Sequence, residues 1–167
     1  MNTPDVSQED VLQGTFLSTK SFYNYPCAHR QWRHKGNCSL VHGYSRSFHF
    51  QFAALTRDAC GFVVDFGNLK WVKDFLEANF DHTLLLEADD PLLPAFREIE
   101  TQGGATVVTC PFGVGMEGTA EWVANVVNSE LQKRSQGRCR VVSLEVKEND
   151  KNSAIYRVPE PTNPGWL

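Results

Sequence analysis

The sequence lacks several features that would each point to a particular class of protein. Lysine and arginine number 16 against 20 aspartates and glutamates, so the formal net charge is −4, which argues against general binding to nucleic acid. No apolar run approaches the roughly 20 residues that a membrane-spanning helix needs. The polar, acidic N-terminus also lacks the pattern of a secretory signal peptide. We therefore expect no nucleic-acid partner and no membrane partner.

Cysteine occurs in a number and a spacing that exclude two further classes. The five residues, Cys27, Cys38, Cys60, Cys110 and Cys139, are odd in number and form no CxxC pair. This pattern argues against a disulfide framework and against a zinc site made of cysteines alone. We expect a reducing, cytoplasmic location, with most of these thiols serving as small packing residues.

Length and composition fit one globular domain. A chain of 167 residues, 41% of them hydrophobic, is long enough to bury a core of its own. The polar start predicts a loose tail over residues 1–12, and the proline-rich end predicts an extended tail over residues 159–167. Residues 13–158 are then expected to form a single domain.

One stretch, residues 27–44, concentrates side chains that carry chemistry. It reads CAHRQWRHKGNCSLVHGY and holds three of the five histidines and two of the five cysteines. It also holds the densest basic run of an otherwise acidic chain, formed by Arg30, Arg33, His34 and Lys35. Such a stretch fits a metal-assisted site for an anionic substrate, and it fits equally a polar loop between two strands. The residues alone leave both interpretations open.

The clearest expected strand covers residues 41–53 and follows directly. Side chains alternate between the two faces of a strand, so His42 and Tyr44 share one face with the phenylalanines that follow them. His49 falls on the opposite face. We therefore expect His49 at the solvent or at a subunit interface rather than beside His42.

The remaining segments predict an α+β domain. Strands are expected over residues 14–25, 62–66, 105–109, 140–148 and 153–158, and helices over about 68–79 and 119–133, with a short helix after Pro91. Asn68 and Thr119 are the expected helix caps, and Pro26 is expected to interrupt strand pairing. Glu148 ends an apolar strand face that begins at Val142. This order predicts an antiparallel sheet covered by helices on one face.

Several separated segments together carry a family resemblance. They are CAHR at 27–30, CSLVHGY at 38–44, GFVVDFGNLK at 61–70, FDHTLL at 80–85, GTAEWVA at 118–124 and VKE at 146–148. In this order they resemble the 6-pyruvoyl tetrahydropterin synthase / 6-carboxytetrahydropterin synthase family. The resemblance implies a T-fold, with a four-stranded antiparallel sheet and two main helices on one face. It also implies a homo-oligomeric barrel, assembled as a trimer or a hexamer.

The resemblance further implies a zinc site held by three histidines. His29 and His42 match two of these positions, whereas Tyr44 stands at the third. Three outcomes follow from this departure. Tyr44 binds the ion as its phenolate, a nearby group such as His34 completes the site, or metal binding is weak or lost.

The resemblance also assigns roles to residues outside the metal site. Cys38 matches the catalytic thiol, and Asp81 with His82 matches an acid/base pair, although an Asp-His sequence at a helix end also fits a simple polar helix stop. Glu148 matches the residue that anchors the pterin, and Thr119 and Glu121 match a segment that frames the pterin pocket between subunits. From charge alone, Arg30, Arg33 and Lys35 are candidates for contacts with a triphosphate.

The expected activity is that of a zinc-dependent lyase acting on 7,8-dihydroneopterin triphosphate. The spacing of Cys38 and His42 resembles the carboxy synthases of bacteria, which favours 6-carboxytetrahydropterin as the product, on a queuosine-type route with loss of triphosphate and acetaldehyde. The alternatives are 6-pyruvoyl tetrahydropterin synthase activity and a non-catalytic pterin-binding relative with an impaired metal site.

Overall fold

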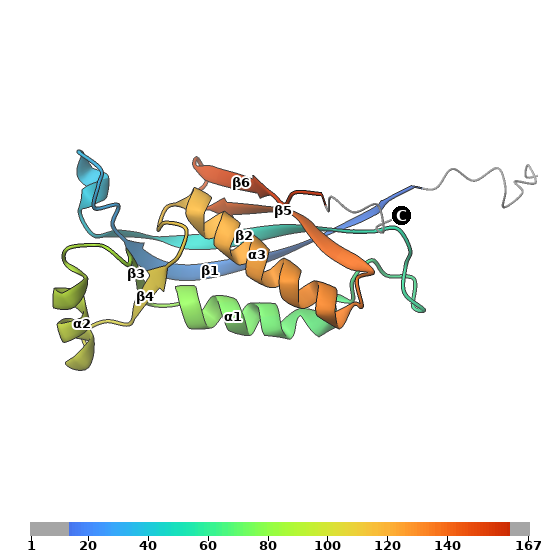
Figure 1. Ribbon diagram of the computed structural model, residues 1–167, viewed down its shortest axis with the longest axis horizontal. Coiled ribbons are helices and arrows are strands. Elements are labelled where there is room, and N and C mark those ends of the chain that lie inside the picture. Colours follow the sequence, from blue (N-terminus) through green and yellow to red (C-terminus); the bar gives the residue numbers. More distant parts are fainter. Residues whose placement is uncertain (1–13, 161–167) are drawn as a thin grey trace, which may run out of the picture.

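Six strands form one mixed sheet in the computed structural model, which describes residues 14–160 (Figure 1). In chain order they are β1 (Phe16–His29), β2 (His42–Ala54), β3 (Thr83–Glu87), β4 (Val107–Cys110), β5 (Cys139–Lys147) and β6 (Ser153–Arg157). Across the sheet their order is β4-β3-β1-β2-β5-β6. The loose tail expected over 1–12 and most of the tail expected over 159–167 lie outside the described residues.

The expectation of a four-stranded antiparallel sheet is wrong by two strands. Antiparallel pairing joins β1, β2, β5 and β6, but β3 pairs parallel with β1, and β4 pairs parallel with β3. Leu84 and Leu86 face one side of the sheet and Leu85 the other, and all three are buried. A strand buried on both faces shows no polar alternation, so its sequence does not distinguish it from a helix end.

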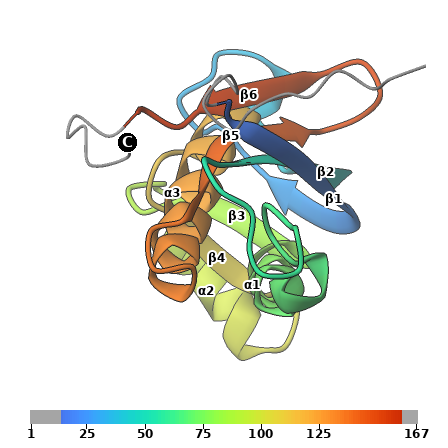
Figure 2. The same cartoon turned by 90° about the vertical axis from the view of Figure 1, so that its right-hand side faces the viewer.

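Three helices cover the two faces of this sheet. Helices α1 (Lys70–Phe80) and α3 (Met116–Arg134) pack against each other through Trp122 and lie on one face (Figures 1 and 2). Helix α2 (Leu93–Thr101) packs through Phe96 on Leu84 and Leu86, on the other side of β3. The two expected main helices are thus present, with the third helix on the opposite face.

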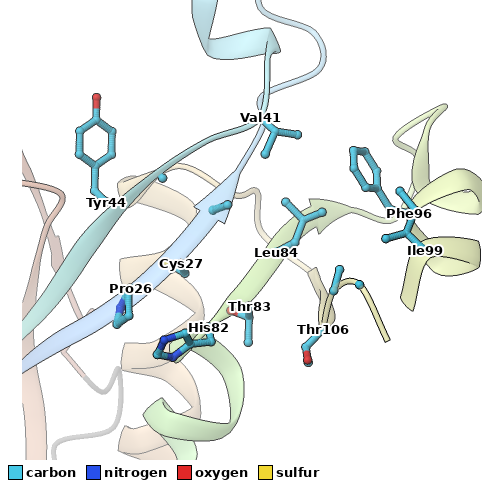
Figure 3. A pocket seen from close by; sticks show the side chains of 14 residues that line it. Pro26, Cys27, Val41, Tyr44, His82, Thr83, Leu84, Phe96, Ile99 and Thr106 are labelled. Carbon is cyan, nitrogen blue, oxygen red and sulfur yellow. The ribbon is translucent and has the colours of Figure 1, made fainter. Parts of the chain in front are cut away.

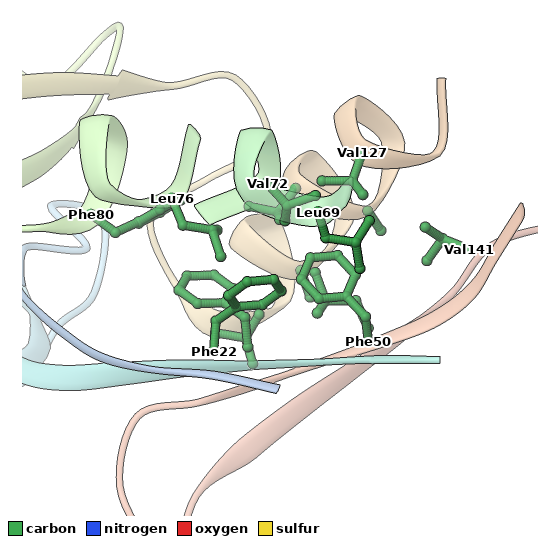
Figure 4. Close-up of a cluster of buried hydrophobic side chains, with 14 of the residues drawn as sticks. Phe22, Phe50, Leu69, Val72, Leu76, Phe80, Val127 and Val141 are labelled. Atoms are coloured by element: carbon green, nitrogen blue, oxygen red, sulfur yellow. The ribbon is translucent and has the colours of Figure 1, made fainter. Parts of the chain in front are cut away.

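The main core lies between the sheet and helices α1 and α3 (Figure 4). Phe48, Phe50 and Phe52 of β2 are at most 1% exposed, as the alternation of that strand predicts. They meet the buried stripe of α1, which includes Val72 and Leu76. Burial of each large apolar side chain contributes about 1.5–3 kcal/mol to folding, so this layer anchors the strands that carry the site.

Strand β1 contains a bulge that the sequence did not reveal. Phe22 pairs with Phe48 and Tyr25 with Arg46, so β1 holds one residue more than β2 between these pairs. Asn24 lies there with a φ of 69°, in the left-handed region that asparagine tolerates better than most residues. Pro26 does not interrupt pairing as expected, because the strand continues to His29 opposite His42.

Several expected local features differ in the structure. The segment 62–66 is not a strand but leads into a short 3₁₀ helix, η3 (Phe66–Leu69), which Asp65 caps by accepting from the Gly67 N–H. Asn68 lies inside η3 and does not cap α1, whose N-cap position is Leu69. Helix α3 begins before Thr119, and Gly115 occupies its N-cap position. A bulge in β5 turns Val142 away from the face of Leu144 and Val146.

Within the described residues, no helix is long and apolar enough to cross a membrane.

Candidate metal centre and surrounding site

Three ligand-type side chains meet at the ends of three neighbouring strands. His29 is the last residue of β1, His42 is the first of β2, and Glu148 follows the end of β5. One ligand atom of each lies within 4.8 Å of those of the other two. His29 Nε2 and Glu148 Oε1 are 3.9 Å apart, and the two imidazole rings lie 4.3 Å apart between centroids. The pairing of β1 with β2 brings His29 to His42, and the pairing of β2 with β5 brings Glu148, which is distant in sequence, to both.

The ring nitrogens of the two histidines are placed to suit metal binding. His42 Nδ1 lies 2.8 Å from the Leu40 carbonyl oxygen, which can only accept, so Nδ1 donates and Nε2 is the ring nitrogen available to an ion. Burial, aided by the charges of Arg46 and His42, lowers the pKa of His29 to about 3. His29 is thus a neutral imidazole at pH 7, and its buried Nδ1 has no hydrogen-bond partner. Two imidazoles and a carboxylate fit a divalent metal ion.

A buried arginine lies beneath this cluster and was not singled out from the sequence. Arg46 is 1% exposed; it donates from Nη1 to Thr119 Oγ1 at 2.7 Å and from Nη2 to the Val114 carbonyl at 2.8 Å. The signal was present, because Arg46 stands on the β2 face between Tyr44 and Phe48, where a charged residue needs partners. Arg46 thereby joins the sheet to α3 and adds a fixed positive charge near the cluster.

Tyr44 does not face the cluster in the way that the expected third ligand would. Its side chain is 43% exposed, and its ring stands edge-on to His42 with the centroids 6.1 Å apart. Figure 3 shows its phenol oxygen directed away from the strand pair, and the residue lies at the edge of a neighbouring cavity that it helps to line. The structure therefore brings His29 and His42 together but leaves Tyr44 at the surface.

Asp81 and His82 form a hydrogen-bonded pair beside a separate cavity. His82 Nδ1 lies 2.6 Å from Asp81 Oδ1, and the His82 N–H donates to the Pro26 carbonyl at 2.7 Å. His82 lines a cavity of about 590 Å³ between the ends of β1 and β3 and helix α2, with mainly apolar walls (Figure 3). His29, His42 and Glu148 do not line it. The His82 side chain is 83% exposed, so a ligand or another subunit can reach it.

Cys38 lies in the loop between β1 and β2, on the short 3₁₀ helix η2 (Asn37–Ser39). It is partly exposed, and its carbonyl accepts from the Gln31 N–H at 2.8 Å. By contrast, burial raises the pKa of the thiols of Cys27, Cys110 and Cys139, to about 12 for Cys110 and about 11 for Cys139. These three thiols are therefore protonated packing groups, which leaves Cys38 and the exposed Cys60 as accessible thiols.

The basic run is held by acidic residues at the end of β3. Arg30 pairs with Asp90 at 3.1 Å, where both side chains are nearly buried. The Arg33 guanidinium contacts the carboxylates of Glu87 and Asp89 and stacks on the Trp32 ring. Lys35 and His34 are exposed, and His34 Nδ1 accepts from the Gly36 N–H. The charge available to a triphosphate is therefore smaller than the sequence alone suggests.

The remaining predicted residues separate into buried and accessible groups. Thr119 is fully buried and accepts from Arg46, so its hydroxyl is occupied within the subunit. Glu121, on the next part of α3, is partly exposed. His49 lies on the other face of β2, as its position in the alternation predicts, between the hydroxyls of Ser21 and Ser47.

Comparison with known proteins gives a consistent family. A family model described as 6-pyruvoyl tetrahydropterin synthase matches residues 18–159. The chain is 32% identical over 120 residues to a probable 6-carboxy-5,6,7,8-tetrahydropterin synthase of Halobacterium salinarum, covering 72% of this chain and 73% of that protein. It is 38% identical over 68 residues to the 6-carboxy-5,6,7,8-tetrahydropterin synthase of Rickettsia typhi, covering 40% of this chain. That match spans 49% of the Rickettsia protein, about half its length.

Solved structures show the same fold. An uncharacterised protein from Wolinella succinogenes superposes with a TM-score of 0.71 at 23% identity, covering 86% of this chain and 98% of that one. A 6-pyruvoyltetrahydropterin synthase variant from Plasmodium vivax superposes with a TM-score of 0.61 at 17% identity, covering 84% of this chain and 97% of that one. At these identities the likeness concerns the architecture alone.

Proposed function

This chain belongs to the 6-pyruvoyl tetrahydropterin synthase family, and from that premise we propose that it is a zinc-dependent lyase acting on 7,8-dihydroneopterin triphosphate. The product that we propose is 6-carboxytetrahydropterin, formed with loss of triphosphate and acetaldehyde in a cytoplasmic queuosine-type route. The observation that carries the proposal is the cluster of His29, His42 and Glu148, because it places a metal-binding group beside a carboxylate suited to a pterin. The names of the relatives favour the carboxy product.

Within the cluster, we assign metal binding to the two histidines and pterin binding to Glu148. His29 and His42 would hold the ion, which when bound supplies a positive charge that makes substrate hydroxyls and the adjacent C–H groups more acidic. A carboxylate can accept N–H bonds from the amino-pyrimidinone edge of a pterin, and Glu148 stands where the family resemblance expects this anchor. The 14% exposure of its side chain leaves it accessible to a ligand but shielded from bulk water.

The proton-transfer groups are Cys38 and His82. Cys38 would accept a proton as thiolate, and His82, oriented by the carboxylate of Asp81, would act as the second acid/base group. Within the described residues, no hydrogen bond or ion pair joins either group to the metal cluster of the same subunit. A site completed by a neighbouring subunit accounts for the strong exposure of the Asp81–His82 pair.

Incubation of the purified protein with dihydroneopterin triphosphate, followed by mass spectrometry, tests this function. We expect 6-carboxytetrahydropterin, with turnover abolished in Cys38→Ala and unchanged in the matched variant Cys60→Ala, which removes an exposed thiol elsewhere. Detection of 6-pyruvoyl-tetrahydropterin instead would assign the pyruvoyl synthase reaction. Pterin binding without any turnover in zinc would contradict the lyase proposal and favour a non-catalytic binding protein.

A further inference from the structure

The family resemblance implies three histidine ligands, yet the third position in this chain is Tyr44. We propose that Glu148, and not Tyr44, is the third protein ligand of the metal ion, so that the centre is formed by two imidazoles and one carboxylate. This inference deepens the proposed function and rests on it only for the presence of a metal.

The spacing of the cluster fits an ion between its members. His29 Nε2 and Glu148 Oε1 are 3.9 Å apart, which is too long for a direct hydrogen bond. Zinc binds nitrogen and oxygen at about 2.0–2.2 Å, so two ligand atoms in a tetrahedral site lie roughly 3.3–3.6 Å apart. The three ligand atoms, all within 4.8 Å of one another, therefore need only small side-chain movements to surround an ion.

The three groups are carried by firmly paired strands. Strands β1, β2 and β5 are neighbours in the sheet, and β1 and β2 pair as far as His29 opposite His42. The Glu148 N–H donates to the Asn152 carbonyl at 3.1 Å, which fixes the backbone at the turn between β5 and β6. The hydrogen bond of His42 Nδ1 to the Leu40 carbonyl orients its ring. A metal ion would thus find its ligands on rigid elements.

Tyr44 fits this set less well than Glu148. Both residues lie on the same sheet face as the histidines by strand alternation, but Tyr44 is nearly half exposed and Glu148 is largely covered. The Tyr44 ring is edge-on to His42, and its oxygen points outward (Figure 3). Among oxygen ligands of zinc in proteins, the carboxylates of Asp and Glu are the usual choice, which also favours Glu148 over the phenol of Tyr44.

Ligation by Glu148 is compatible with pterin recognition. An ionised carboxylate has two oxygens and about four lone-pair sites, so one oxygen can bind the ion while the other accepts an N–H group. Two imidazoles with one carboxylate hold zinc in known hydrolases and also suit iron(II) and cobalt(II). The class of ligand that we assign is therefore a first-row divalent cation with open coordination positions for substrate.

Metal titration of the chelator-treated full-length protein tests this assignment. Zinc binding is measured by calorimetry, and cobalt binding by the visible absorption of the bound ion, both without substrate. We expect a single equivalent in the wild type and a loss of affinity of more than about 100-fold in Glu148→Gln, since even the loss of an indirect partner costs 10–100-fold. Tyr44→Phe should stay within about threefold of the wild type and keep its cobalt spectrum.

Two further variants make the comparison specific. Glu145→Gln removes a carboxylate from the opposite face of β5, where Glu145 pairs with Lys147, and should leave the affinity unchanged. Glu148→Asp keeps the carboxylate but shortens the side chain by one methylene group. The metal affinity of this variant should therefore fall between those of the wild type and Glu148→Gln, and its cobalt spectrum should change. Thermal unfolding of each variant shows whether it is folded, and Glu148→Asp decides the question if Glu148→Gln does not fold.

The outcomes separate this inference from the proposed function. Loss of affinity in Tyr44→Phe with full affinity in Glu148→Gln would overturn the assignment, and so would a wild type that binds no metal. Product formation from dihydroneopterin triphosphate is measured separately. A wild type that turns over, together with a Glu148→Gln variant that binds metal normally, would refute the ligand assignment and leave the lyase function standing.

Discussion

Arg30 and Arg33 are neighbours in one basic run, yet the structure gives their charges different surroundings. Arg30 is 13% exposed and pairs with Asp90, whose side chain is fully buried, whereas Arg33 is 56% exposed on the surface. Asp90 also accepts from the Leu92 N–H and so holds the turn before α2. Buried ion pairs are costly to break because the remaining charge stays in a medium of low polarity. Exposed pairs contribute little because water screens them.

We predict that the two arginines differ sharply in their effect on stability. Arg30→Ala should lower the free energy of unfolding by about 3–5 kcal/mol, because it leaves the Asp90 carboxylate buried and unpaired. Arg33→Ala should lower it by no more than about 1 kcal/mol. Denaturant unfolding of both variants measures the difference. Equal losses would show that the exposure of the two pairs does not govern their strength.

The Arg33→Ala variant also tests whether Arg33 contacts the triphosphate, as predicted from its charge. If Arg33 leaves Glu87 and Asp89 to bind a triphosphate, Arg33→Ala should raise KM while leaving the protein folded. An unchanged KM would show that Arg33 does not bind substrate. Its role would then be the surface ion pairs that join the β1–β2 loop to the end of β3.

At the scale of elements, the bulge in β1 decides which face of the sheet carries the site. Phe22 has an even number and Tyr25, Cys27 and His29 have odd numbers, yet all four face the core side. The extra residue between Phe22 and Tyr25 causes this switch, because a shift of one residue reverses every later side chain. Without the bulge, His29 would point away from His42.

Variants at Asn24 test the role of the bulge. Asn24→Gly should preserve the site, because glycine adopts a φ of 69° without strain. Asn24→Val should lower stability by about 1–2 kcal/mol, since a β-branched residue is strained in the left-handed region. Deletion of Asn24 should preserve metal binding in the folded product, because regular alternation without the extra residue keeps Tyr25, Cys27 and His29 on the face of Phe22 and leaves His29 opposite His42. Loss of metal affinity in the folded deletion variant would contradict this geometry.

At the scale of the whole molecule, the proposed catalytic groups lie in two separate places. The metal cluster is at the ends of β1, β2 and β5, whereas His82, which is hydrogen-bonded to Asp81, lines a cavity between β1, β3 and α2. The family resemblance expects oligomers with the pterin pocket between subunits. Such an assembly would let His82 of one subunit complete the site formed by Cys38 and the metal cluster of a neighbour.

Mixing two inactive variants tests whether subunits share a site. Cys38→Ala and His82→Ala are co-expressed with different tags and purified as mixed oligomers. A site with Cys38 from one subunit and His82 from the next should be intact in about a quarter of random pairings, so activity should return to about that fraction. Light scattering gives the oligomer size. If the mixture stays inactive although mixed oligomers form, both groups act within one subunit.

Features that depend on local patterns could be predicted from the sequence. The alternation of residues 41–53 placed His42, Tyr44 and the phenylalanines on one face and His49 on the other, as the structure confirms. The order of short motifs indicated the family that the comparisons confirm. These inferences succeed because side-chain direction in a regular strand follows from position alone.

Features that depend on pairing between distant segments could not be predicted from the sequence and are seen in the folded protein. The β1 bulge brings His29 opposite His42, the end of β5 brings Glu148 to them, and the end of β3 engages the basic run with carboxylates. The parallel strands β3 and β4 likewise follow from pairing and from burial on both faces. No local period encodes such contacts, because strand register and ion pairing are set by the packing of the whole sheet and its helices.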